Sequence, residues 1–330
     1  MHRDSGSVIL IVYVDDILIT GSVTNGIEDT KRFLHSQFVT KDLGLLKYFL
    51  GIEVTSTDDG TILSQRRYVL DLLAEVGLLD CKPISTPMDP KVNLYDPNSP
   101  DYLDSRRYRT IVGKLLYLTV TRPDISFAIG RVSQFMEKPK KVHWNAVYHI
   151  LRYLKFSLGN GLCFKSHGHL NLVGFSDADY AGSNEDKHSI TGYCTYVGGN
   201  LVTWRSKKQH VVSRSSAESE YRAMAHTTCE LLWISSLLTD MGIPIQHPIP
   251  MYCDNKAAIF IANNPAFHEC TKHIEVDCHF IRDAVMRGQI CTPFLQSSKQ
   301  LADIFTKALP KAHLMKIMFK LGMRDVYALV

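Results

Sequence analysis

The second half of the chain shows the most regular alternation of hydrophobic and polar positions. Its β-branched and apolar runs predict three successive strands, over 172–180, 191–197 and 201–205. Helix and strand patterns then alternate, with a helix over 215–238, a strand over 251–253, helices from Asn255 and over 274–287, a strand over 289–295 and a helix from about Ser298. A meander followed by alternating helices and strands predicts a mixed α/β sheet with flanking helices.

The first half carries shorter patterns. Two β-branched runs on either side of an acidic pair predict a hairpin over 8–21 with its carboxylates at the turn. Further elements are expected in this order: a helix over 27–38, strands over 48–54 and 61–64, and helices over 108–121, 124–137 and 142–158. Five prolines between positions 82 and 100 indicate a crossing segment between the strands and the later helices.

Composition narrows the class of protein. The 330 residues carry 37 Lys and Arg against 33 Asp and Glu, a net charge of +4, which permits a nucleic-acid partner without requiring one. Eight scattered cysteines include no Cys-x-x-Cys pair, so we expect a reducing compartment and no disulfide framework. Acidic residues interrupt the longest apolar run, over 8–20, so neither a membrane helix nor a signal peptide is expected.

Four acids stand at or near predicted strand ends and helix starts. Asp177 lies within the first predicted strand, where an aspartate is unfavourable unless it faces water or serves a function. Glu218 completes a Ser-x-x-Glu capping box with Ser215, but helical spacing also places it on the stripe that faces the sheet. Asp254 could simply cap the next helix, and Asp303 could be a solvent-facing acid of the last helix.

Together the four acids predict a cation site. Each comes from a different element, and all are expected at one edge of the sheet. A cluster of carboxylate oxygens suits Mg²⁺ or Mn²⁺ rather than zinc, because hard cations prefer oxygen ligands. Two such ions about 4 Å apart can activate a water molecule and stabilise the leaving oxygen of a phosphodiester.

The segments around these acids resemble the ribonuclease H domain of copia-type LTR retrotransposon Pol polyproteins. They read GFSDADYAG, SSAESEYRAM, YCDNKAAI and QLADIFTKAL, and the resemblance covers about 170–322. It implies an RNase H-like fold with a mixed five-stranded sheet, and cleavage of the RNA strand of an RNA–DNA hybrid. The implied catalytic and metal-binding acids are Asp177, Glu218, Asp254 and Asp303, which would hold two Mg²⁺ ions, with Mn²⁺ as a substitute. Glu220 and Asp179 are the competing assignments.

The first half resembles the same Pol proteins. Positions 13–16 read YVDD, the reverse-transcriptase turn whose acids, here Asp15 and Asp16, bind the polymerase metals. Segments over 42–44, 48–54 and 108–117 resemble the palm and the thumb–connection region. The implied organisation is a partial reverse-transcriptase palm over 1–80, a proline-rich crossing segment and helical thumb or connection over 81–168, the ribonuclease H domain over 169–310 and a helical tail over 311–330.

Two departures from the family pattern bear on activity. The sequence begins twelve residues before Tyr13, so the fingers and the palm strand with a further metal-binding aspartate are expected to be absent. We therefore expect no DNA synthesis by this chain alone. In addition, 295–299 reads LQSSK, without the mobile histidine that many RNases H carry after their last strand. This second departure bears on turnover rather than on the chemistry.

The densest basic stretch precedes the predicted helix over 215–238. Lys and Arg beside an aromatic ring are typical of proteins that track a nucleic-acid backbone, and a solvated loop is the alternative. The expected nucleic-acid-binding side chains are Trp204, Arg205, Lys207, Lys208, Gln209, Arg214 and Asn255. Asn255 is included for a contact to a 2′-hydroxyl or a base edge in the minor groove.

One further cluster invites a zinc interpretation. It consists of His268, Cys270, His273, Cys278 and His279. Its spacing fits no common zinc finger, and much of it falls in the helix predicted over 274–287, so a structural role is preferred.

The sequence therefore predicts a metal-dependent ribonuclease H fused to a truncated, polymerase-inactive reverse transcriptase. The expected reaction is in-line attack of water on the RNA phosphodiester, leaving a 3′-hydroxyl and a 5′-phosphate. One alternative is a non-catalytic nucleic-acid-binding remnant of a decayed element, folded only in its second half. Another is a DNA-directed nuclease on the same fold, which differs only in substrate preference. The resemblance further implies an RNA–DNA hybrid and the Gag or other Pol components of a virus-like particle as partners. The implied location is cytoplasmic, in such particles, with access to the nucleus.

Overall fold

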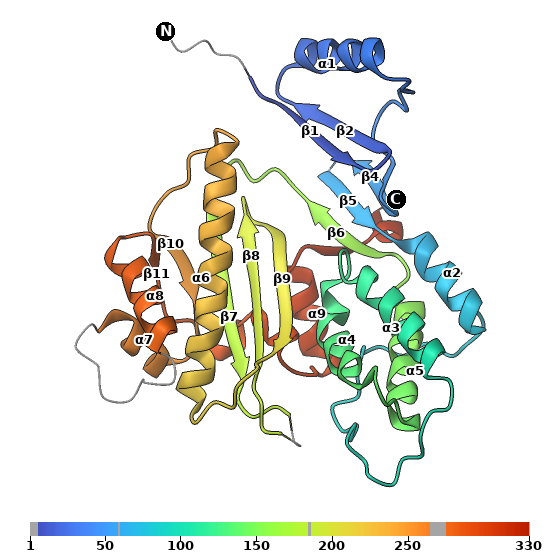
Figure 1. The fold of residues 1–330 in the computed structure, drawn as a ribbon, viewed down its shortest axis with the longest axis vertical. Helices are drawn as coiled ribbons and strands as arrows, with labels where there is room; N and C mark the ends of the chain where they lie inside the picture. The colour runs from blue at the N-terminus through green and yellow to red at the C-terminus, as the bar shows by residue number, and fades with distance from the viewer. Residues whose placement is uncertain (1–5, 59, 184–185, 265–274, 330) are drawn as a thin grey trace.

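The computed structural model describes residues 6–58, 60–183, 186–264 and 275–329. Within these residues, the chain forms two five-stranded sheets with helices packed beside them, and a separate hairpin projects from the body (Figure 1). Three residues of the zinc interpretation, His268, Cys270 and His273, lie outside the described residues. No helix of the described segments is both long and apolar enough to pass through a lipid bilayer.

The second half forms a mixed five-stranded sheet, as predicted. Its strands are β7 (Leu172–Asp179), β8 (Ile190–Val197), β9 (Asn200–Lys208), β10 (Ile249–Tyr252) and β11 (Ile290–Cys291). They stand in the order β11-β10-β7-β8-β9. The pairs β7–β8 and β8–β9 are antiparallel, whereas β10 runs parallel to both β7 and β11. Gly198 and Gly199, both with positive φ, make the tight turn between β8 and β9.

The long helix α6 (Ser216–Asp240) packs across β7 and β8 (Figure 1). Ser215 caps its start, because its hydroxyl accepts the backbone N–H of Glu218 at 3.2 Å. The buried side of α6, including Tyr221 and Leu231, shares a hydrophobic core with β10, α7 (Lys256–Asn263) and α8 (Glu275–Met286). The helix predicted over 215–238 is confirmed.

The segment after β11 differs from the prediction. It forms two short 3-10 helices, η3 (Ser297–Lys299) and η4 (Ala302–Phe305), instead of one continuous helix from about Ser298. Leu301, Ile304 and Phe305 are all buried, so this stretch has no alternation between an apolar and a solvent-facing side. The strand predicted over 289–295 is reduced to β11, because Pro293 has no N–H to donate to a sheet.

The second sheet joins the first half of the chain to its C-terminal segment. Its order is β12-β6-β5-β4-β3, and each neighbouring pair is antiparallel. The strands are β3 (Tyr48–Phe49), β4 (Ile52–Thr57), β5 (Gly60–Ser64), β6 (Asn160–Phe164) and β12 (Met323–Asp325). Leu50 and Gly51 both adopt positive φ and divide the strand predicted over 48–54. The short strands β6 and β12 were not predicted.

Helices cover the first half and follow η4. They are α1 (Thr24–Gln37), α2 (Arg66–Val76), α3 (Ser105–Leu118), η1 (Pro123–Ile125), α4 (Ser126–Val132), η2 (Ser133–Phe135), α5 (Lys141–Phe156), α9 (Lys311–Lys320) and η5 (Val326–Leu329). The helix expected over 124–137 is therefore divided into η1, α4 and η2. Helix α2 was not predicted.

One hydrophobic core connects the two halves. Its members include Leu115 of α3, Leu151 of α5, Cys194 of β8, Phe305 of η4 and Met318 of α9. The segments expected as 81–168, 169–310 and 311–330 all contribute to this core, so they pack on one another.

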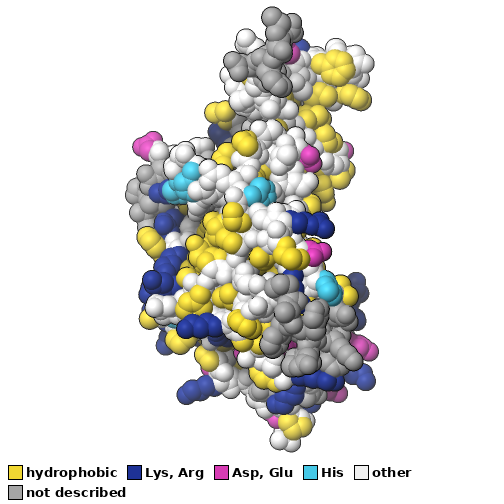
Figure 2. All heavy atoms as spheres, turned by 90° about the vertical axis from the view of Figure 1, so that its left-hand side faces the viewer, with side chains coloured by type: hydrophobic (Ala, Val, Ile, Leu, Met, Phe, Trp, Pro, Cys, Tyr) yellow, Lys and Arg dark blue, Asp and Glu magenta, His cyan; other side chains and the backbone are white. Residues whose placement is uncertain are grey.

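The N-terminal hairpin stays outside this core. Strand β1 (Val8–Tyr13) pairs with β2 (Asp16–Gly21) to form a two-stranded sheet, and α1 packs next to β2. Apolar side chains of β1 remain exposed, among them Leu10, Ile11 and Val12. Figure 2 shows hydrophobic side chains gathering at this upper end of the molecule. The hairpin predicted over 8–21 is confirmed, and its apolar strand β1 stays exposed.

Candidate metal centre

Two parallel strands bring Asp177 and Asp254 to the same end of the second-half sheet. Strand β10 pairs with β7 so that Tyr252 lies opposite Phe175. Asp177 follows Phe175 by two residues within β7, and Asp254 follows Tyr252 by two residues just beyond the end of β10. The carboxyl ends of parallel strands are where ligands bind in α/β sheets. Asp177 is buried there, and Asp254 is half-buried.

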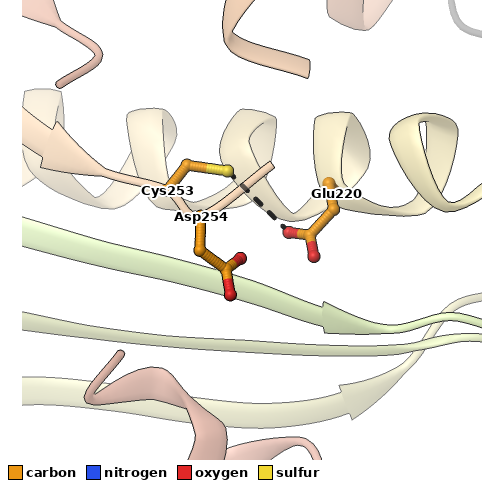
Figure 3. Close-up of side chains that lie close together, drawn as sticks. All are labelled: Glu220, Cys253 and Asp254. Atoms are coloured by element: carbon orange, nitrogen blue, oxygen red, sulfur yellow. Dashed lines mark hydrogen bonds between the residues drawn. The ribbon is translucent and has the colours of Figure 1, made fainter. Parts of the chain in front are cut away.

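Glu220, Cys253 and Asp254 form a compact group of ligand-type side chains (Figure 3). One oxygen or sulfur atom from each lies within 4.8 Å of the corresponding atoms of the other two. Glu220 comes from the beginning of α6, and its Oε2 lies 4.0 Å from the Sγ of Cys253 at the end of β10. In the part of the chain that the structure describes, no other three such side chains lie this close together.

Glu218 does not join this group, and Glu220, a competing assignment, takes the place expected for it. The Glu218 carboxylate accepts hydrogen bonds from the Arg222 guanidinium and from the backbone N–H of Arg214, each at 2.7 Å. Residues two positions apart on an α-helix point about 200° apart, so Glu218 and Glu220 face opposite sides of α6. Glu218 accepts a backbone N–H just before the first turn of α6 and pairs with Arg222, so its role is the structural one expected of a capping residue.

Asp303 reaches the site from η4. It is buried, and its Oδ1 lies 2.8 Å from the Nζ of Lys307. The same Nζ is 4.0 Å from Oδ2 of Asp177, and the Thr306 hydroxyl donates a hydrogen bond to that oxygen. The segment therefore brings one acid, one hydroxyl and one cation to β7. Asp179, the other competing assignment, ends β7 and does not belong to the group in Figure 3.

A glycine in β8 permits this close approach of η4. Gly192 lies opposite Asp177 in the β7–β8 ladder, and a Cβ atom there would stand 2.5 Å from Cγ2 of Thr306. The Gln300 side-chain amide fixes the start of the segment by donating to the carbonyl of Ser176 at 2.8 Å. Neither Gly192 nor Gln300 was expected from the sequence. The available signal was the glycine inside a predicted strand, which often marks a place where another backbone comes close.

Burial and the repulsion of neighbouring carboxylates raise the pKa of two of these carboxyl groups, those of Asp177 and Glu220. Burial raises the pKa of Asp177 to about 7, against the opposing charge of Lys307, and the charge of Asp303 contributes to the rise. Burial also raises the pKa of Glu220 to about 9, with further contributions from Asp177 and Asp254. Burial alone would lower the pKa of Lys307, but the negative charges around it outweigh this effect and raise the pKa. The site therefore favours additional positive charge.

The donor set fits a hard divalent cation. Among the described side chains, the clustered carboxyl groups belong to Asp177, Glu220, Asp254 and Asp303, and the Lys307 ammonium lies against those of Asp177 and Asp303. Carboxylate oxygens are preferred ligands of Mg²⁺ and Mn²⁺, and a divalent ion would favour the ionised form of each acid. Burial keeps the pKa of Cys253 well above its ordinary value, so its thiol stays protonated and is a poor ligand.

Asp15 and Asp16 occupy the turn of the β1–β2 hairpin. Both are exposed, and the turn passes through Val14, which has a φ of 50°. No third ligand-type side chain of the described residues forms a group with them. The assignment of these two acids to polymerase metals remains a prediction.

Three of the expected nucleic-acid-binding side chains have structural partners. Trp204 packs against the shared core and donates its Nε1–H to the carbonyl of Thr119 at 3.1 Å, so its ring does not stand open for base stacking. Gln209 is buried and donates to Thr191 and to a backbone carbonyl. Asn255 caps α7 with its side-chain oxygen. These contacts explain the three residues without a nucleic acid.

The remaining basic side chains are more accessible. Arg205, Lys207 and Arg214 are exposed, whereas Lys208 pairs with Asp186. A cavity of about 230 Å³ opens next to this stretch, lined in part by Lys207, Lys208, His210, Arg222 and His226. None of the four clustered carboxyl groups lines it, so the basic surface and the acidic site are separate features of the domain.

Comparison with known proteins places these features in a family. Residues 2–90 match the family described as reverse transcriptase (RNA-dependent DNA polymerase). The chain is 44% identical over 328 residues to the retrovirus-related Pol polyprotein from transposon RE2 of Arabidopsis thaliana, which is 99% of this chain and 22% of that polyprotein. It is 32% identical over 229 residues to a putative transposon Ty5-1 protein of Saccharomyces cerevisiae, or 68% of this chain and 74% of that protein.

Two solved structures share parts of the architecture at low sequence identity. LC11-RNase H1 in complex with RNA/DNA hybrid is 11% identical, with a TM-score of 0.33 over 41% of this chain and 93% of its own. The foamy viral protease-reverse transcriptase in complex with RNA/DNA hybrid is 14% identical, with a TM-score of 0.48 over 91% of this chain and 37% of its own.

The sequence relationship extends over nearly the whole chain, although the chain spans about a fifth of the length of the RE2 polyprotein. The chain belongs to the copia-type retrotransposon Pol proteins, with a reverse-transcriptase segment that precedes an RNase H-like mixed sheet.

Proposed function

We propose that this chain is a metal-dependent ribonuclease H that cleaves the RNA strand of RNA–DNA hybrids. The observation that carries the proposal is the convergence of buried Asp177, Glu220 and Asp303 with half-buried Asp254 at one end of the sheet. Burying several acids together is unfavourable for stability, so a site that retains them is a candidate for function.

The four carboxyl groups would hold two Mg²⁺ ions, and Mn²⁺ would serve as a substitute. Such ions supply activation of water and stabilisation of the leaving oxygen. Asp177, Glu220 and Asp303, as the buried members, would provide fixed oxygen ligands, while half-buried Asp254 stands nearer to solvent and substrate. Thr306 orients Asp177 by donating its hydroxyl to one carboxylate oxygen and leaving the other free.

The substrate proposal rests on the family and on the exposed basic side chains. The two solved structures that share parts of the architecture are described as complexes with RNA/DNA hybrid. In this chain, Arg205, Lys207 and Arg214 are exposed, in contrast to half-buried Trp204 and buried Gln209, and they would contact phosphates of the hybrid. Asp15 and Asp16 lack a third acid among the described residues, so we propose no DNA synthesis by this chain alone.

The test compares two glutamates of one helix. We expect Glu220→Gln to lower Mg²⁺-dependent cleavage of a labelled RNA–DNA hybrid by at least about 100-fold, because it removes a buried metal ligand. Glu218→Gln is the matched control, and we expect its cleavage rate to stay within about threefold of wild type, since its partners are Arg222 and a backbone N–H rather than the clustered acids.

Two results would contradict the proposal. Loss of cleavage in Glu218→Gln but not in Glu220→Gln would show that the wrong carboxylate has been assigned. If the wild-type chain bound the hybrid but left it intact in both Mg²⁺ and Mn²⁺, the non-catalytic remnant would be the better description. Products with a 5′-phosphate on the downstream fragment are expected, and they can be read by end-labelling.

A further inference from the structure

A lysine stands inside the acidic site. The Nζ atom of Lys307 is 2.8 Å from Oδ1 of Asp303 and 4.0 Å from Oδ2 of Asp177. Both carboxyl groups are buried, whereas the Lys307 side chain keeps 44% of its surface exposed. Its ammonium group therefore enters the site from the solvent side.

Among the ion pairs of the described residues, those of Lys307 are the ones that reach the clustered acids. Lys307 lowers the pKa of Asp177 and of Glu220, and no other cation of the described chain acts on either group to a comparable extent. Arg222 lies on α6, the helix that carries Glu220, but it forms an ion pair with Glu218 on the side of the helix that faces away from Glu220. Lys307 therefore provides the positive charge that compensates the buried acids in this structure.

An ammonium and a divalent cation cannot favourably occupy the same small group of oxygens. Two positive charges in contact with the same oxygens repel each other, and at a given distance the repulsion of the ammonium by a divalent ion is twice that by a monovalent one. A lysine side chain has four rotatable bonds in its stem, so Lys307 can swing outward without a change of fold.

We propose that Lys307 is the internal counter-cation of the metal-free site and that it leaves the carboxylates when divalent ions bind. By this contact it stabilises the metal-free domain and weakens the apparent affinity for metal. Lys307 is a positioning residue in this role, because it acts through Asp177 and Asp303. The inference rests on the proposed metal site, but it does not require that the hybrid be the substrate.

The experiment measures Mn²⁺ binding by the whole chain, by calorimetry and by the loss of the free-ion electron paramagnetic resonance signal. We expect Lys307→Gln to bind Mn²⁺ at least about fivefold more tightly than wild type, because no cation must be displaced. In EDTA we expect the same variant to melt at a lower temperature than wild type, since buried carboxylates lose their partner. Lys307→Met should behave in the same way, and Lys307→Arg should restore near-wild-type binding.

Lys299→Gln is the matched control. Lys299 is exposed in η3 of the same segment, and its replacement removes the same unit of charge at some distance from the acids. We expect its Mn²⁺ affinity to change by less than about twofold, because exposed charges are screened by solvent and salt. The control separates a local effect of the ammonium from a general effect of net charge.

Different outcomes separate the failure of this inference from the failure of the proposed function. Unchanged or weaker Mn²⁺ binding in both Lys307→Gln and Lys307→Met, with wild type binding normally, overturns the role of Lys307 alone. Absence of Mn²⁺ binding by folded wild type overturns both this inference and the metal site. Tighter binding in the two neutral variants, combined with no cleavage of hybrid by wild type, would support the lysine role and contradict the ribonuclease function.

Discussion

The molecule buries charged side chains in two places, and the two places are built in opposite ways. In the helical part of the first half, the Arg122 guanidinium donates two hydrogen bonds to Asp124, at 3.0 and 2.7 Å. Tyr153 donates to the same carboxylate at 2.6 Å, and Arg122 also donates to the carbonyl of Ser157 at 3.0 Å. Every charge in this group meets a charge of opposite sign or a hydrogen-bond partner.

The acidic site at the end of β7 and β10 lacks this balance. Lys307 is the cation that lies against two of the four carboxyl groups, those of Asp177 and Asp303, and the pKa values of Asp177 and Glu220 rise as a consequence of burial and repulsion. Of the two carboxylate oxygens of Asp177, Oδ2 is the one that accepts a hydrogen bond, from the Thr306 hydroxyl.

The difference shows how a structural charge can be told from a functional one. A buried ion pair with matched charges and donors maintains the fold and needs nothing from outside. A buried cluster with excess charge of one sign lowers the free energy of unfolding, because the like charges repel each other. A bound ligand of opposite charge raises that free energy again. The same substitution, Asp to Asn, should therefore act in opposite directions at the two places.

The largest effect is expected at the balanced pair. Asp124→Asn leaves the buried Arg122 guanidinium without a counter-charge, and such a change costs about 3–5 kcal/mol in the free energy of unfolding. Chemical denaturation followed by circular dichroism measures it, with exposed Asp71→Asn as the control that should change stability by less than about 0.5 kcal/mol. A loss below about 1 kcal/mol for Asp124→Asn would show that the Arg122–Asp124 pair contributes little to the stability of the fold.

Much of the fold could be predicted from hydrophobic periodicity. Long elements with clear patterns, such as β7, β8 and α6, follow the sequence closely, because each has a continuous buried side. Short elements such as β6 and β12 were not predicted, since their pairing depends on contacts between distant parts of the chain. The segment over 297–305 was wrongly expected to be one helix because it is enclosed by β7, β8 and the shared core.

The candidate site could be predicted in part. Asp177, Asp254 and Asp303 meet at one end of the sheet as the order of elements suggests. The choice between Glu218 and Glu220 needed the start of α6 to be known to the residue, because a shift of two positions turns the side chain to the other side of the helix. The Lys307 contact could not be foreseen, since it depends on how η4 packs on β8.

The next effect has the opposite sign. We expect Asp177→Asn to stabilise the metal-free chain by about 2 kcal/mol at pH 8, because it removes a carboxylate whose ionised form is disfavoured by burial. A carboxyl group with a folded-state pKa above its unfolded value contributes stability at low pH and loses it as pH rises through the folded-state pKa. In EDTA, the melting temperature of wild type should therefore fall between about pH 5 and pH 9, the window given by Asp177 and Glu220.

The variant and the pH series check each other. Asp177→Asn should flatten the fall in melting temperature, and saturating Mn²⁺ should flatten it in wild type by favouring the ionised acids. A melting temperature that rises with pH over this window in EDTA would contradict the assignment of Asp177 and Glu220 as weak acids. Destabilisation by Asp177→Asn at pH 8 would place Asp177 with Asp124, as a member of a balanced structural pair.

The smallest effect on stability is expected from the glycine that lets η4 approach the sheet. A Cβ atom at Gly192 would stand 2.5 Å from Thr306 Cγ2 and 3.0 Å from the carbonyl oxygen of Ala302, so Gly192→Ala must push η4 outward. We expect a loss of about 1 kcal/mol, at the low end for overpacking because the displaced segment is short. Displacement of Thr306 and Asp303 from Asp177 should weaken Mn²⁺ binding by at least about tenfold.

Gly113→Ala is the control, since Gly113 is exposed in α3 with open space around it. This substitution should raise the free energy of unfolding by about 0.5–1 kcal/mol, because alanine has the higher helix propensity. If Gly192→Ala bound Mn²⁺ as tightly as wild type, η4 would not be a part of the metal site. The excess of negative charge that distinguishes this site from the Arg122–Asp124 pair would then come from the acids of β7, α6 and the end of β10 alone.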